Sequence, residues 1–89
     1  MPRILAFSSS FEAGSTALDD LRNRAASLGI ELVVVAKTGV FVFEPDGRIE
    51  RTDRIVGDVT TAALAYRARG DAAFFVDHGT AYRVAEMAA

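Results

Sequence analysis

The sequence predicts a single small α/β domain, a two-layer sandwich built on a mixed sheet. Short runs of apolar, β-branched and aromatic residues alternate with segments of helical periodicity, and turn residues separate them. The chain has 89 residues, which is enough for one hydrophobic core. No internal repeat or linker interrupts residues 1–89, and the predicted element order is β-α-β-β-β-α-β.

The first strand and the first helix are separated by a polar loop. Residues Arg3 to Ser8 hold a continuous apolar run, which is typical of a strand buried on both faces. After the loop, apolar residues at spacings of three and four predict a helix with one apolar stripe. The members of this stripe are Leu18, Leu21, Ala25 and Leu28. Ser15 or Thr16 can cap the first amides of the helix, and Gly29 can end it.

The second strand is predicted over Ile30 to Ala36. This segment contains three consecutive valines, which fit a buried strand better than a helix because they branch at Cβ. A strand, a helix and a second apolar strand in close succession form a βαβ unit. Its two strands are expected to be parallel and joined by a right-handed crossover.

A β-hairpin is predicted next, with arms Val40 to Glu44 and Arg48 to Thr52. The Pro45-Asp46-Gly47 segment between them supplies a fixed φ, a side-chain turn bond and a residue that tolerates positive φ. The first arm offers valine on one face and phenylalanine on the other, more apolar surface than a one-sided sheet needs. The second arm is mostly charged, as protected sheet edges are.

A second helix and a last strand complete the predicted order. Asp58 is a candidate N-cap for a helix over Val59 to Arg69, and Gly70 can close it. The apolar run within Asp71 to Asp77 predicts the last strand. A ferredoxin-like arrangement is the alternative topology, because strand, helix, hairpin, helix and strand also describe its split βαβ pair.

The C-terminal segment has two interpretations. Thr80 could cap a helix that runs through Ala85, Met87 and Ala89. Alternatively, His78-Gly79 could form a two-residue turn that returns the chain as a strand over Thr80 to Val84. The sequence does not choose between them.

Composition excludes several classes of function. The chain has no cysteine and one histidine, so thiolate sites, disulfides and multi-histidine metal centres are excluded. The chain has ten basic and twelve acidic residues, and this near-neutral balance argues against nucleic acid as a partner. The sequence has neither a long apolar stretch nor a signal peptide, so a cytoplasmic protein without membrane contact is expected.

A candidate ligand site lies where the parallel strands are expected to end. Ligands of open α/β sheets collect beyond the carboxyl ends of the strands. The candidate ligand-binding residues at this edge are Ser8, Ser9, Ser10, Gly14, Ser15, Thr16, Lys37 and His78. Hydroxyls, free amides of a helix N-terminus, an ammonium and an imidazole suit a phosphate or carboxylate. A plain connection whose hydroxyls cap the helix is the alternative interpretation.

The segment from Ile4 to Ser10, with Gly14-Ser15-Thr16 after it, resembles the first strand and phosphate loop of flavodoxin-like NADPH-dependent FMN reductases. The resemblance implies that Ser8, Ser10, Ser15 and Thr16 match the positions that surround the flavin phosphate in that family. The chain has too few βα units for a complete flavin enzyme. No flavin or other cofactor is therefore expected.

No catalytic or metal-binding constellation is predicted. Asp77 and His78 are adjacent, and neighbours on a strand point to opposite faces, so a turn or cap histidine is favoured over a general base. No Gly-x-Ser-x-Gly motif marks a nucleophile. Asp19 and Asp20 suit the dipole at the start of the first helix, which explains them without magnesium.

The apolar surplus of the hairpin is the main indication of function. Packing beneath the helices is one explanation, and a surface for a second subunit or a partner protein is the other. The candidate interface residues are Phe11, Val40, Phe41, Val42 and Phe43. The expected function is a non-enzymatic interaction module that binds another macromolecule as a homodimer, of the size typical of bacterial or phage accessory proteins. The alternative is a protein that binds phosphate or a nucleotide at the Ser8 to Thr16 loop.

Overall fold

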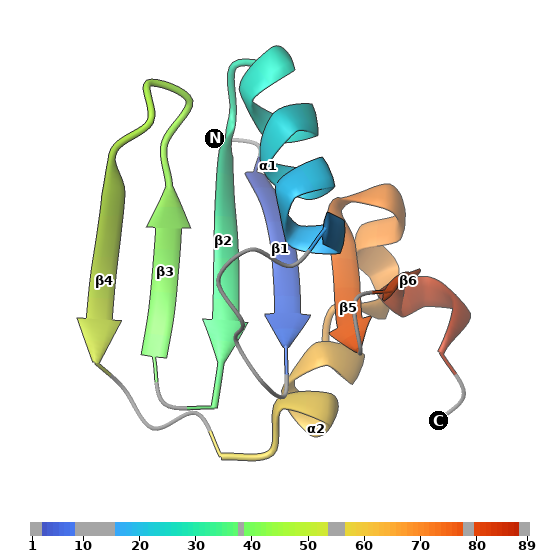
Figure 1. The fold of residues 1–89 in the computed structure, drawn as a ribbon. Coiled ribbons are helices and arrows are strands. Elements are labelled where there is room, and N and C mark those ends of the chain that lie inside the picture. The colour runs from blue at the N-terminus through green and yellow to red at the C-terminus, as the bar shows by residue number, and fades with distance from the viewer. Residues whose placement is uncertain (1–2, 9–15, 38, 54–56, 78–79, 88–89) are drawn as a thin grey trace.

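The computed structural model describes residues 3–8, 16–37, 39–53, 57–77 and 80–87 of the chain (Figure 1). These residues form a six-stranded sheet in the order β4-β3-β2-β1-β5-β6, together with two α-helices and two 3₁₀ segments, η1 and η2. The elements in chain order are β1 Arg3–Ser8, α1 Thr16–Ser27, β2 Glu31–Ala36, β3 Gly39–Phe43, β4 Ile49–Asp53, α2 Val59–Leu64, η1 Arg67–Ala72, β5 Ala73–Asp77, β6 Thr80–Arg83 and η2 Val84–Glu86.

The sheet is mixed, as predicted. Strands β1, β2 and β5 run parallel, and β3, β4 and β6 are antiparallel to their neighbours. Strand β1 pairs directly with β2, with Leu5 opposite Val33, and with β5, with Phe7 opposite Phe75. A ferredoxin-like sheet places another strand between the parallel strands of each βαβ unit. The direct pairing of β1 with both parallel partners therefore excludes that alternative.

Both faces of the sheet are apolar at its centre. Side chains alternate between the faces of a strand, so Ile4 and Ala6 of β1 pack beneath α1, whereas Leu5 and Phe7 pack on the opposite face. Helix α1 packs on one face of the sheet, and α2 with η2 forms a shorter cover over Leu5 and Phe7 on the other face. The predicted class, a small α/β sandwich with a mixed sheet, is confirmed.

The first helix ends one residue before the last member of its predicted apolar stripe. Helix α1 stops at Ser27, and Gly29 takes a φ of 69°, a left-handed conformation that ends helices. Leu28 consequently lies past the helix and is 64% exposed, so its predicted place in the stripe is wrong. Ile30 packs against the α1 cluster instead, because the turn at Gly29 directs the chain back to the sheet.

The second helix is shorter than predicted, because α-helical bonding stops at Leu64. The amides of Ala65 and Tyr66 donate to Ala62 and Ala63, three residues earlier, which tightens the chain into 3₁₀ geometry. The Tyr66 ring then lies 5.4 Å from that of Phe7. Tertiary contact with β1 thus replaces the helical continuation that the sequence favoured.

The C-terminal segment forms a strand and not a helix. Thr80–Arg83 is β6, which pairs antiparallel with β5, and the chain then turns into η2. Val84 is fully buried in the cluster beneath α2, and Arg67 donates a hydrogen bond to the backbone carbonyl of Met87. The pairing of β6 with β5, which is followed by the burial of Val84, decides the alternative left open by the sequence. The predicted His78-Gly79 turn lies outside the described residues.

The hairpin has the predicted turn and edge. Oδ1 of Asp46 accepts a hydrogen bond from the backbone N–H of Arg48, Oδ2 accepts one from its side chain, and Gly47 has a φ of 93°. Chiefly because of the backbone hydrogen bond, the pKa of Asp46 lies below its usual value. Strand β4 is exposed along its whole length at the end of the sheet, as predicted for a protected edge.

Asp58 caps α2 and makes the stability of this helix sensitive to acid. Its carboxylate accepts hydrogen bonds from the Thr61 hydroxyl at 2.9 Å and from the backbone N–H groups of Thr61 and Thr60 at 3.4 and 3.0 Å. These bonds hold the pKa of Asp58 below its ordinary value of 3.8, with the Thr61 hydroxyl as the largest cause. A lowered folded-state pKa contributes stability above the unfolded-state pKa, and this contribution is lost as pH falls through the folded-state value.

We expect the free energy of unfolding of the wild type to fall more steeply below about pH 5 than that of Asp58→Asn. Asparagine caps a helix but does not titrate, so the variant lacks this one source of acid sensitivity. Asp46 titrates in both proteins and cancels from the comparison. Urea denaturation between pH 7 and pH 3 measures the difference, and parallel pH profiles would contradict the role of the Asp58 carboxylate.

Candidate functional site

A row of valines crosses β2 and β3 on the face of the sheet that carries α2. Val33 lies opposite Val42, and Val35 lies opposite Val40, so the four side chains form one patch, here called the valine face. All four pack against the cluster beneath α2. Glu50 and Thr52 of β4 lie beside Val42 and Val40 and border this patch at the edge of the sheet.

The valine face is covered only in part. Helix α2 packs over β1 and β5, and η2 packs over β5, so the described cover lies to one side of β2 and β3. Leu5 and Phe7 on β1 are consequently buried, whereas Val35, Val40 and Val42 are only partly buried. The order of the strands thus leaves three β-branched side chains partly open to solvent.

The phenylalanines of the first hairpin arm lie on the opposite face. Phe41 and Phe43 are partly buried against the α1 cluster. The guanidinium of Arg51 lies 5.5 Å from the Phe41 ring centroid, and that of Arg22 lies 4.6 Å from the Phe43 ring centroid. The predicted interface residues therefore divide between two faces: Val40 and Val42 belong to the valine face, and Phe41 and Phe43 lie beneath arginines.

The parallel strands end together at the edge where the ligand site was predicted. Ser8, Ala36 and Val76 lie side by side in the register of β1, β2 and β5, so the carboxyl ends of these strands meet at one edge. The Ser8 side chain is 2% exposed, and Lys37 is exposed. Thr16 begins α1. The other predicted residues, Ser9, Ser10, Phe11, Gly14, Ser15 and His78, lie outside the described residues.

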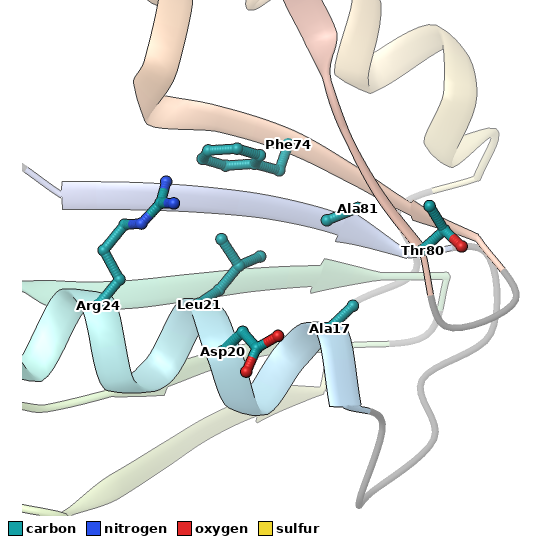
Figure 2. A pocket seen from close by; sticks show the side chains of 7 residues that line it. All are labelled: Ala17, Asp20, Leu21, Arg24, Phe74, Thr80 and Ala81. Carbon is teal, nitrogen blue, oxygen red and sulfur yellow. The ribbon is translucent and has the colours of Figure 1, made fainter.

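Sequence reasoning missed a groove between α1 and β6 (Figure 2). The groove has a volume of about 380 Å³ and is here called the edge groove. Its lining residues are Ala17, Asp20, Leu21 and Arg24 of α1, Phe74 of β5, and Thr80 and Ala81 of β6. No sequence signal could have located it, because it depends on the C-terminal segment forming a strand beside β5.

The edge groove has an apolar centre with two charges on its α1 wall. Figure 2 shows Leu21 and Ala17 facing the strands that carry Phe74 and Ala81. The Arg24 guanidinium lies 5.7 Å from the Phe74 ring centroid. Asp20 is exposed one helical turn before Arg24, and no residue that the structure describes forms an ion pair with it.

A second groove, of about 350 Å³, lies on the hairpin side of α1. Its lining includes Phe43, the Arg22 side chain above it, and Asp19, whose carboxylate is 4.0 Å from Arg22. Both charges on this wall of the helix are therefore engaged with each other. The two grooves differ in this respect, since Asp20 lacks such a partner among the described residues.

Metal and membrane sites are not found in the described part of the chain. Within residues 3–8, 16–37, 39–53, 57–77 and 80–87, no three histidine, aspartate or glutamate side chains gather closely enough to hold a metal ion. Neither described helix has the length and apolar character needed to cross a bilayer.

The fold and its surfaces define a small α/β domain with a mixed sheet, a partly covered valine face and a groove beside one sheet edge. No protein-family model, curated protein or solved structure matches the chain.

Proposed function

We propose that the protein is a non-enzymatic interaction module that acts by binding another macromolecule as a homodimer. The observation that carries this proposal is the partial exposure of the valine face beside the α2 cover. Contiguous apolar patches on small domains mark surfaces that another chain covers. The sheet supplies such a patch at Val35, Val40 and Val42, which are partly buried.

A second copy of the chain suits the valine face. β-Branched side chains present a flat, pleated surface, and two such surfaces pack face to face in β-sandwiches. A twofold axis places the same patch on both partners, so each copy covers the valines of the other. The charged border at Glu50 then remains at the rim, where it stays hydrated.

Self-association tests the proposal, and Val42→Lys is the informative variant. Glu50 lies directly opposite position 42 on β4, so the new ammonium has a cross-strand carboxylate and the folded monomer tolerates it. In a dimer the same ammonium is removed from water within an apolar contact. We expect its dimer dissociation constant to rise by about 100-fold, which corresponds to about 3 kcal/mol. Sedimentation velocity across a concentration series measures this change.

Asn23→Lys is the matched control, because it adds the same charge at an exposed position of α1 on the other side of the sheet. This control should dimerise like the wild type. Circular dichroism of Val42→Lys verifies that the monomer is folded, and Val42→Thr provides a milder variant if it is not. A wild type that sediments as a monomer at tens of micromolar would overturn the homodimer.

The competing function is the binding of a small anion at the carboxyl edge of the parallel strands. The convergence of β1, β2 and β5 at one edge, with the exposed Lys37 after β2, favours it. Inorganic phosphate separates the two functions. A phosphate-dependent rise in melting temperature that Lys37→Ala removes supports the anion site, and an unchanged melting temperature contradicts it.

A further inference from the structure

We propose that the edge groove and β6 together bind an extended peptide segment of a partner protein, which adds to β6 as a further strand. This inference rests on the proposed function, because it names the partner-binding surface of the interaction module. It uses the α1 face and the β6 edge of the sheet, whereas the second copy is proposed to cover the valine face.

Strand β6 is the less protected of the two sheet edges. It is the last strand in the sheet order, and all four of its side chains are exposed. Strand β4 at the other edge carries charged side chains at Glu50, Arg51 and Asp53, whereas β6 carries one, Arg83, which forms an ion pair with Glu86. An edge strand presents backbone N–H and C=O groups to which another strand can pair. Peptides that bind in this way take their affinity from the backbone bonds and their specificity from pockets for alternate side chains.

The edge groove supplies a pocket for such a side chain. Ala81 lies opposite Val76, so it faces the α1 side of the sheet. Because Ala81 and Ala17 are small, a space remains between β6 and α1, and Leu21 and Phe74 contribute apolar surface to its wall (Figure 2). An apolar side chain from a strand paired with β6 would lean over Ala81 into this space.

The charge on the groove wall specifies a second residue of the peptide. The Asp20 carboxylate lies on the groove wall without an ion-pair partner among the described residues, while Arg24 lies over the Phe74 ring. Side chains two positions apart share one face of an extended peptide. The peptide class that fits is therefore an extended segment with an apolar residue and, two positions away, a lysine or arginine that pairs with Asp20.

A random heptapeptide library displayed on phage provides the probe, with the full-length protein as the immobilised target. We expect enrichment of an apolar residue separated by one position from a basic residue. Ala81→Phe fills the groove and should weaken the selected peptides by at least tenfold. Asp20→Asn should abolish the preference for the basic residue. N-methylation at alternate peptide positions should abolish binding, because it removes backbone donors.

The control that matches Asp20→Asn is Asp19→Asn, which neutralises the neighbouring carboxylate on the wall of the other groove. This variant should bind the selected peptides like the wild type. Ala81→Leu serves as a smaller filling variant if circular dichroism shows that Ala81→Phe is unfolded.

Three outcomes would overturn the proposal: no enriched sequence, equal binding of the selected peptides by the groove-filling variants, or β6 amide signals that shift with protein concentration alone. The last outcome would assign the edge to a second copy. Val42→Lys separates this proposal from the homodimer. Peptide binding by the monomeric variant shows that the groove functions without self-association, and a wild-type monomer that binds the peptides overturns only the homodimer.

Discussion

Replacing Phe7 with alanine should lower the free energy of unfolding by about 4 kcal/mol. Phe7 is 2% exposed on β1, between two parallel neighbours, and its ring lies 5.4 Å from the ring of Tyr66. Truncation removes the apolar contacts of the ring and leaves a cavity that the surrounding strands cannot fill. Small domains have a total stability of about 5–15 kcal/mol, so this one change would remove a large part of it.

Urea denaturation followed by circular dichroism measures the loss. Tyr82→Ala is the control, because Tyr82 is also aromatic but is 52% exposed on β6. We expect this control to change the free energy of unfolding by less than about 1 kcal/mol. Equal losses in the two variants would show that the Phe7 ring does not form part of the core.

Replacing Val84 with aspartate should lower the free energy of unfolding by at least about 3 kcal/mol. Val84 is fully buried in η2, within the apolar cluster that also contains Leu5 and Phe7. A carboxylate at this position loses its hydration and faces apolar side chains. Thermal and urea unfolding at neutral pH measure the destabilisation, which should decrease at acid pH as the new carboxyl takes up a proton.

Ala85→Asp is the matched control, since it introduces the same side chain at the next position, where the chain is exposed. Its melting temperature should remain close to that of the wild type. If Val84→Asp and Ala85→Asp have the same melting temperature, the C-terminal segment does not complete the core. That outcome would also remove the support for β6 as a fixed edge strand.

Local signals in the sequence closely predicted the elements from β1 to the start of α2. The continuous apolar run of β1 and the valines of β2 are typical of strands that are covered on both faces. Gly29 and Asp58 mark helix ends through backbone conformation and side-chain capping, which involve only near neighbours. The hairpin turn depends likewise on the side chain of Asp46 and on the positive φ of Gly47.

Tertiary contacts decided the second helix and the C-terminal segment. Tyr66 fits a helix by its sequence environment, yet its contact with Phe7 accompanies the end of α2. The choice between helix and strand after residue 80 was open because the segment satisfies both local patterns. Pairing with β5 and the burial of Val84 select the strand, and both involve residues that are distant along the chain or on another element.

The candidate surfaces likewise depend partly on local sequence and partly on tertiary structure. The sequence by itself indicated an apolar surplus at Val40 and Val42, because alternation along a strand shows which side chains share a face. It could not show that α2 covers β1 and β5 and leaves the valine face partly open, since the placement of a helix depends on strand order. The edge groove exists only because β6 returns beside β5 and brings Ala81 near α1. Chain-local propensities therefore determined the elements as far as the hairpin, together with their polar and apolar faces. Long-range packing determined where α2 ends, that residues 80–83 form a strand, and which faces remain uncovered.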